Sequence, residues 1–119
     1  MIFNYDGIRK NRQDRLREFQ TNLLKGNLSY IILFKLENNK ALTGYDIIKY
    51  NLVKFKIRLS SKTVYRLLYS LEHYGLILGK IDPSGRRIYT LTPEGDEYIK
   101  TVRSFKQEIR LFLTNIFEG

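Results

Sequence analysis

The 119-residue sequence contains no cysteine, and it has only one histidine and two prolines. The absence of cysteine excludes disulfide bonds, zinc–thiolate sites and thiol catalysis. A metal site would have to be built almost entirely from carboxylates, yet the acidic residues fall in separate segments where capping or surface positions account for them. No serine–histidine–acid set, glycine-rich phosphate loop or carboxylate pair stands out. We therefore expect no metal, no cofactor and no enzymatic activity.

The sequence also lacks long apolar runs and linker-like stretches. No run is long enough to span a membrane, and the first residues lack the charged and apolar regions of a signal peptide. We therefore expect a cytoplasmic protein without a membrane partner. Because no Gly/Ser/Pro-rich segment divides the chain and 43% of its residues are hydrophobic, we expect a single small domain with a real core.

Acidic residues are the scarcer charged class. The chain has 21 lysines and arginines against 12 aspartates and glutamates, so its formal net charge is +9 and its pI is near 9.8. Such an excess favours a polyanionic partner, with nucleic acid ahead of an anionic membrane. The alternative is a basic surface that serves only solubility.

The most informative stretch runs from residue 60 to residue 75. Its apolar residues recur at intervals of three and four, so they form one stripe of a helix whose opposite face is basic, hydroxylated and aromatic. Ser60 or Ser61 can cap its start, and Gly75 can end it in the left-handed conformation. Such a helix suits a DNA major groove, so we predict a recognition helix. Its predicted DNA-binding residues are Ser60, Ser61, Lys62, Thr63, Tyr65, Arg66 and Tyr69.

A capped helix precedes this stretch. Thr43 and Asp46 have the spacing of a capping box, in which hydroxyl and carboxylate satisfy the first free amides. Residues 53–59 are expected to form an irregular or extended connection, so the two helices resemble a helix-turn-helix with a lengthened turn. Upstream, the nearly continuous apolar run of residues 28–38 predicts a buried helix at the centre of the domain, with a buried strand as the alternative.

A hairpin is predicted after the recognition helix. Two β-type runs, residues 76–81 and 87–91, enclose a turn with Pro83 and Gly85 at the second and fourth positions, as in a type I turn. A hairpin in this place is typical of the wing of a winged helix. The alternative is a hairpin that only covers the core. As a wing, it would contact phosphates or the adjacent minor groove through Lys80, Arg86 and Arg87.

Amphipathic helices are predicted at both ends. Apolar residues between Ile8 and Leu24 form a stripe among several arginines, with Gly26 as a C-terminal cap, and this helix is expected to pack on the domain or the dimer. At the other end, Thr92 and Pro93 begin a helix of about 23 residues.

The C-terminal helix carries a heptad seam that so small a domain cannot cover. We predict that the seam forms a homodimer interface. The alternative is packing on the N-terminal stripe of the same chain, and the version we favour has both terminal helices building the interface together. The predicted seam residues are Tyr98, Val102, Phe105, Ile109, Phe112 and Ile116.

An ordered set of motifs resembles the PadR family of winged-helix transcriptional regulators. The resemblance covers residues 25 to about 98 and rests on Lys25-Gly26-Asn27-Leu28, Gly44-Tyr45-Asp46-Ile47, Ser60-x-x-Thr63-Val64-Tyr65, Leu71-Glu72-x-x-Gly75-Leu76-Ile77 and Arg86-Arg87-Ile88-Tyr89-Thr90-Leu91-Thr92-x-x-Gly95. It implies a homodimer, joined through its C-terminal helices, that binds an inverted repeat in a promoter, usually as a repressor. Lys62 and Arg66 stand where the family usually has glycine and proline. Some relatives respond to small aromatic effectors, but no residues here match an effector site.

These expectations combine into one hypothesis. The chain is a mostly helical α+β protein with an N-terminal basic helix (1–25), a winged-helix DNA-binding region (26–92) and a C-terminal dimerisation helix (93–119). It acts as a dimeric, sequence-specific regulator that binds double-stranded DNA. Two alternatives stay open: a sequence-tolerant architectural DNA-binding protein, and a winged helix used for protein–protein contact.

Overall fold

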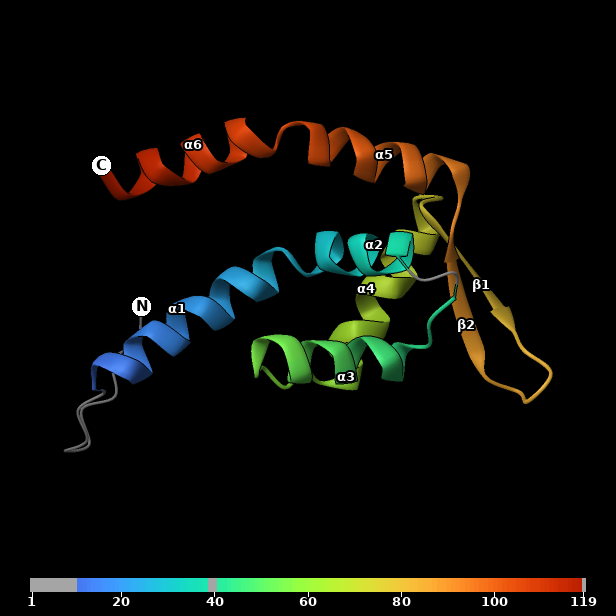
Figure 1. Cartoon of the computed structure of the whole chain (residues 1–119). Coiled ribbons are helices and arrows are strands. Elements are labelled where there is room, and N and C mark those ends of the chain that lie inside the picture. Colours follow the sequence, from blue (N-terminus) through green and yellow to red (C-terminus); the bar gives the residue numbers. More distant parts are fainter. Residues whose placement is uncertain (1–10, 39–40, 119) are drawn as a thin grey trace.

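The computed structural model describes residues 11–38 and 41–118, which form six helices and one two-stranded antiparallel sheet (Figure 1). The part of the predicted N-terminal helix that precedes Asn11, including the first residue of its apolar stripe, lies outside the described residues. The elements follow the order predicted for a mostly helical winged helix. They are α1 (Arg12–Gly26), α2 (Leu28–Asn38), α3 (Gly44–Phe55), α4 (Ser61–His73), β1 (Ile77–Ile81), β2 (Arg87–Leu91), α5 (Pro93–Ser104) and α6 (Lys106–Glu118).

Side-chain caps fix where the inner helices begin. At α3 the Asp46 N–H donates to Thr43 Oγ1 at 3.0 Å and the Thr43 N–H donates to Asp46 Oδ2 at 2.9 Å, which confirms the predicted capping box. Ser60 caps α4 and Thr92 caps α5. In each case the side-chain hydroxyl accepts the backbone N–H of the residue three positions later. The start of α4 is therefore placed by local chemistry that the sequence displays.

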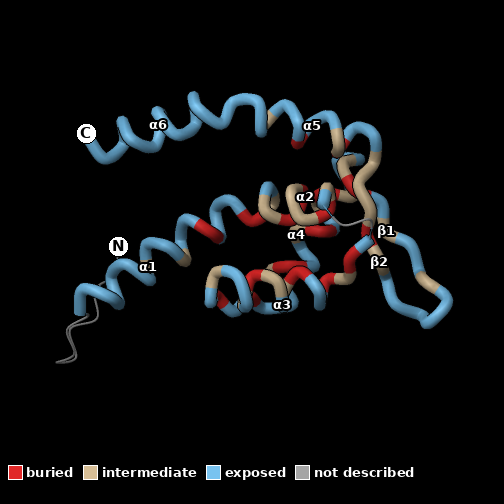
Figure 2. The backbone as a smooth tube through the Cα atoms, viewed as in Figure 1, coloured by how far each residue is buried: buried red, intermediate tan, exposed pale blue. Residues whose placement is uncertain are grey.

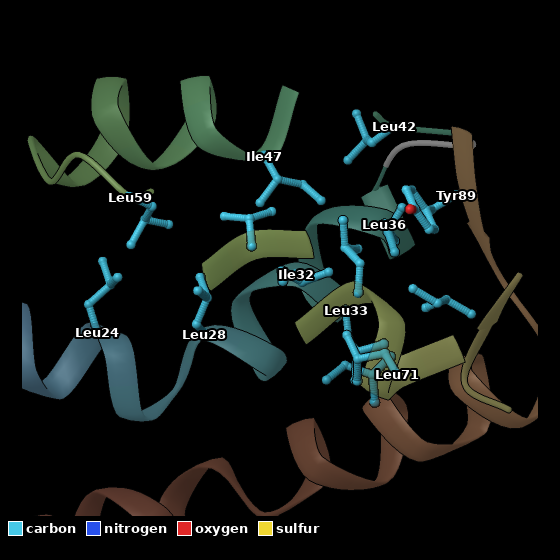
Figure 3. Packing of buried hydrophobic residues seen from close by; sticks show 14 of the residues in the cluster. Leu24, Leu28, Ile32, Leu33, Leu36, Leu42, Ile47, Leu59, Leu71 and Tyr89 are labelled. Atoms are coloured by element: carbon cyan, nitrogen blue, oxygen red, sulfur yellow. The ribbon is translucent and has the colours of Figure 1, made fainter. Parts of the chain in front are cut away.

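The core lies around α2, which occupies the middle of the molecule between α5 and α3 (Figures 1 and 2). Its residues Leu28, Ile32 and Leu33 are almost fully buried, as the apolar run predicted. Helix α4 packs against it through Val64 and Leu68, both fully buried. Other members of the cluster come from α1, α3, the connection before α4, the last turn of α4 and the sheet, including Leu24, Ile47, Leu59, Leu71 and Tyr89 (Figure 3).

Two glycines were predicted to end helices: Gly75 does so, whereas Gly26 does not. Gly75 follows α4 with φ +78°, the left-handed conformation predicted for it. The prediction that Gly26 caps α1 is wrong: Gly26 is the last residue of the helix, and Asn27 caps it with φ −118°. The Asn27 N–H donates to the Leu24 carbonyl at 3.0 Å and its side chain donates to the Leu23 carbonyl at 2.7 Å. These bonds use the free carbonyls, so no left-handed residue is needed.

The predicted continuous C-terminal helix is interrupted at Phe105. Two hydroxyls in the last turn of α5 donate to backbone carbonyls: Thr101 to Glu97 at 3.0 Å and Ser104 to Thr101 at 2.6 Å. Such bonds compete with the helical ladder and bend helices. The Phe105 N–H then bonds three residues back, to Val102, and α6 begins at the next residue.

The hairpin has the predicted strands, with Gly79 opposite Tyr89 and Ile81 opposite Arg87. An isolated bridge between Leu42 and Tyr89 ties β2 to the segment before α3. Within the described residues, no helix combines the length and apolar character that crossing a membrane requires.

Candidate nucleic-acid interface

Helix α4 presents a polar, basic and aromatic face to solvent because its apolar stripe is anchored in the core. With Val64 and Leu68 buried, Lys62, Arg66 and Tyr69 are rotated outward, and all three are exposed. Tyr69 is 73% exposed. Neither Lys62 nor Arg66 has a hydrogen bond or ion pair to any described residue, so both cations are free to meet a ligand.

The Ser60 hydroxyl at the start of α4 caps the helix. The Ser60 hydroxyl accepts the Thr63 N–H at 3.1 Å and donates to Thr63 Oγ1 at 2.9 Å. Ser60 is thus used as the helix cap, one of the two roles predicted for it, while the neighbouring Ser61 is exposed. The backbone N–H groups of this first turn give α4 the positive end of its dipole beside Lys62.

Tyr65 lies between the two helices of the helix-turn-helix. Its ring is 45% exposed and covers the first residue of α3, Gly44. A Cβ at Gly44 would come within 2.6–2.7 Å of the Tyr65 hydroxyl and Cε1 atoms. The absence of a Cβ at Gly44 therefore leaves the room that the Tyr65 ring occupies against the start of α3.

The wing tip is a tight turn organised by Asp82. Its carboxylate accepts the Ser84 hydroxyl at 2.7 Å, the Ser84 N–H at 3.0 Å and the Arg86 N–H at 2.8 Å. The Gly85 N–H donates to the Asp82 carbonyl at 2.9 Å, and φ at Gly85 is +87°. Arg86 pairs with Asp82 at 3.0 Å but remains 68% exposed. Lys80 is also exposed, and no described residue pairs with it.

Asp82 should make this turn sensitive to acid. The Ser84 hydroxyl, followed by the Arg86 N–H, lowers the pKa of the Asp82 carboxyl from 3.8 to about 2. Because the folded-state pKa lies below the unfolded one, the carboxylate stabilises the turn fully above pH about 4 and loses this contribution as the pH falls toward 2. NMR titration of the Ser84 and Arg86 amides should show this transition, and Asp82→Asn should abolish it. Amide shifts of the wild type that stay constant over this range would contradict the assignment.

Arg87 differs from the free cation that the sequence suggested. Its Nη2 lies 3.0 Å from both carboxylate oxygens of Glu72 in α4, and this pairing raises the pKa of the Arg87 guanidinium. The structure therefore separates the three predicted wing cations into two classes. Lys80 and Arg86 are directed to the wing surface, whereas Arg87 joins the wing to α4.

The structure adds basic residues that the predicted site omitted. Lys56 and Arg58 are exposed in the connection before α4, whereas Ile57 and Leu59 are buried. The alternation of apolar and basic residues in this segment was the available signal. On α3, Tyr45 is also exposed, one residue after the Gly44 that Tyr65 covers. Exposed basic residues are thus present on the connection that precedes α4 as well as on α4 and the wing.

The predicted dimer seam divides into two parts. In α5, Tyr98 stacks on Tyr30 of α2 with ring centroids 6.5 Å apart, and Val102 packs against the core. In α6 every described residue is exposed (Figure 2). Arg103 pairs with Glu37 and holds α5 on α2, which lowers the pKa of the Glu37 carboxyl. The exposed apolar side chains from the break onward are Phe105, Ile109, Leu111, Phe112, Leu113, Ile116 and Phe117.

The fold and the exposed face of α4 define a winged-helix transcription regulator. Residues 32–101 match the family described as "Transcriptional regulator PadR-like family". The chain belongs to this family, which confirms the resemblance read from the motifs and the prediction that the protein is a regulator, not an enzyme.

Solved structures agree with this assignment. A PadR family transcriptional regulator from Eggerthella lenta DSM 2243 is 24% identical, with a TM-score of 0.72 over 90% of this chain and 96% of that chain. A PadR-like regulator from Bacillus cereus is 26% identical, with a TM-score of 0.64 over 82% and 98%. PadR of Bacillus subtilis, solved in complex with operator DNA, is 28% identical, with a TM-score of 0.55 over 62% of this chain and 45% of that chain. No curated protein matches the sequence.

Proposed function

We propose that the protein is a homodimeric, sequence-specific regulator that binds an inverted repeat in double-stranded DNA and acts as a repressor. The observation that carries the proposal is the exposed face of α4, where Lys62 and Arg66 lie beside Tyr69 and neither cation has a partner among the described residues. The Bacillus subtilis relative was solved in complex with operator DNA, which supports duplex DNA as the ligand of this fold.

The two parts of the interface would read DNA differently. Arg66 is the first choice for a base contact because a guanidinium can donate to both O6 and N7 of guanine. Lys62 and Tyr69 would enter the major groove with it, whereas Lys80 and Arg86 on the wing would bind phosphates or the minor groove without reading sequence. Ser61, Thr63 and Tyr65 lie at the border of this surface, where they would contact the DNA backbone.

Dimerisation would be the task of the C-terminal region. The apolar face of α6 is exposed over the whole helix, more than a soluble monomer ordinarily leaves uncovered. Phe117 of α6 makes an edge-to-face contact with Phe19 of α1 at 5.8 Å, while both rings remain about half or more exposed. The two terminal helices are thus near enough to form one interface together, and a second copy is the partner with a matching apolar face.

Selection from random duplexes with the purified protein tests the function. A dimer of this kind should enrich a two-fold symmetric motif whose half-sites are separated by about one helical turn. Enrichment of a featureless pool would indicate an architectural DNA-binding protein. Absence of any salt-sensitive DNA complex at low ionic strength would favour a winged helix that binds an acidic protein.

Arg66→Gln should relax this motif at one position in each half-site. Losing a bidentate contact to guanine costs about 1–3 kcal/mol per site. Titration of the selected duplex and of a variant changed at that base pair measures the effect: wild type should discriminate between them and R66Q should not. Ser70→Gln, on the half-buried flank of α4, is the control that should keep the discrimination. Equal discrimination by R66Q and wild type would remove Arg66 from the base-reading set.

A further inference from the structure

A single carboxylate joins the recognition helix to both strands of the wing. The Glu72 carboxylate, one residue before the end of α4, accepts from Arg87 Nη2 of β2 with both oxygens at 3.0 Å. Its Oε2 atom also accepts the backbone N–H of Gly79 in β1 at 3.1 Å. Three hydrogen bonds from two donors, one on each strand, therefore converge on one side chain of α4.

The Arg87 side chain reaches this carboxylate by crossing the hairpin. Its guanidinium lies directly over Gly79: a Cβ on that residue would be 2.8–2.9 Å from Nη2, Cζ and Nε. The guanidinium also lies 5.7 Å from the ring of Tyr89, which is buried. Arg87 is thus held by the carboxylate, the Gly79 backbone and an aromatic ring, and its orientation is set from inside the protein.

The wing needs such an attachment because two strands alone are only marginally stable. At its base, Tyr89 is bridged to Leu42 and the Thr92 hydroxyl donates to the Gly75 carbonyl at 2.6 Å. Between this base and the tip, no other side chain of the described residues forms an ion pair from α4 to the hairpin. We propose that Glu72 and Arg87 are positioning residues that fix the angle of the wing relative to α4, so that both reach DNA together.

This proposal rests on the DNA-binding function proposed above. The alternative is that Arg87 contacts a phosphate, and the two predict opposite changes in DNA affinity when Glu72 is replaced. If Arg87 were a phosphate contact, Glu72 would compete with DNA for it. Glu72→Gln would then free the guanidinium and remove a negative charge, so DNA affinity would rise. If the pair positions the wing, E72Q lowers the affinity even though the protein becomes more positive.

Titrations of the selected duplex with E72Q, R87Q and E72Q/R87Q at several salt concentrations separate the two cases. We expect each single variant to weaken binding by about tenfold, and the double variant to be no weaker than either, because the two residues act as one unit. The slope of log affinity against log salt should stay as in wild type. Arg86→Gln is the matched control: it should reduce that slope by about one. Higher affinity for E72Q, or a reduced slope for R87Q, would overturn the proposal.

Hydrogen exchange in the absence of DNA tests the same pair independently of function. E72Q should speed exchange of the Gly79 amide and of the outer hairpin amides, whereas R86Q should leave Gly79 unchanged. Since the ion pair is partly exposed, the urea midpoint of global unfolding should change little. If wild type binds no duplex, the proposed function fails, but unchanged Gly79 exchange in E72Q is what would overturn the positioning role.

Discussion

Aspartate at both Ile109 and Phe112 should convert the protein to a monomer and lower its affinity for an inverted repeat by roughly 10²–10⁴-fold. Both side chains lie on the exposed apolar face of α6, so a buried interface there would have to desolvate two carboxylates. The loss in DNA affinity follows because two linked half-site contacts become independent. Sedimentation analysis and titration of the full and half-site duplexes measure the two effects.

A charge-matched variant controls for the added negative charge. Gln107→Asp/Thr114→Asp also adds two carboxylates to α6, but on the opposite side of the helix, about half a turn from Ile109. It should remain dimeric and keep most of its affinity. Circular dichroism should show both variants folded, since the α6 residues contribute nothing to the buried core. A dimeric I109D/F112D protein would place the interface elsewhere.

Gly95→Ala should destabilise the fold by about 3 kcal/mol. Gly95 is buried in the first turn of α5, and an added Cβ would overlap the Leu76 carbonyl oxygen and lie 2.9 Å from its carbon. The obstacle is backbone and cannot rotate away, so α5 would have to shift from the hairpin base. Urea unfolding, at the same protein concentration as wild type, should show the loss as a lower midpoint with little change in slope.

Gly26→Ala is the control for an alanine added to a helix. Nothing lies within 4 Å of a Cβ at Gly26, and its φ is negative. Alanine is favoured over glycine in a helix by about 1 kcal/mol, so this variant should be neutral or more stable. A G95A protein as stable as G26A would contradict the close approach of α5 to the hairpin.

Local chemistry explains which parts of the fold could be predicted. The Thr43–Asp46 box, the Ser60 cap and the buried stripe of α4 each depend on residues within one or two turns, and each is found where its spacing placed it. The break at Phe105 has a local cause too, but it depends on which backbone carbonyls accept the Thr101 and Ser104 hydroxyls. Apolar periodicity contains no information about that choice.

The candidate site was less predictable, because its side chains have partners that lie far apart in the chain. Arg87 and Glu72 are separated by fifteen positions, and only the folded hairpin brings them together. A basic residue near a wing tip predicts an accessible cation, and that expectation fits Lys80. For Arg87 the sequence could not show that a carboxylate would meet it. For Arg58 a signal did exist in the sequence, because it alternates with Ile57 and Leu59, and the structure shows that both apolar neighbours are buried.

The break between α5 and α6 at Phe105 has a consequence for the proposed DNA target. Helix α5 is held on the winged-helix unit by Arg103–Glu37 and the Tyr30–Tyr98 stack, whereas α6 extends beyond it (Figure 1). In the proposed dimer joined through α6, this break would lie between the two-fold axis and each α4 helix. The angle between α5 and α6 would then determine how far apart the two α4 helices are, and with that how many base pairs separate the half-sites of the proposed operator.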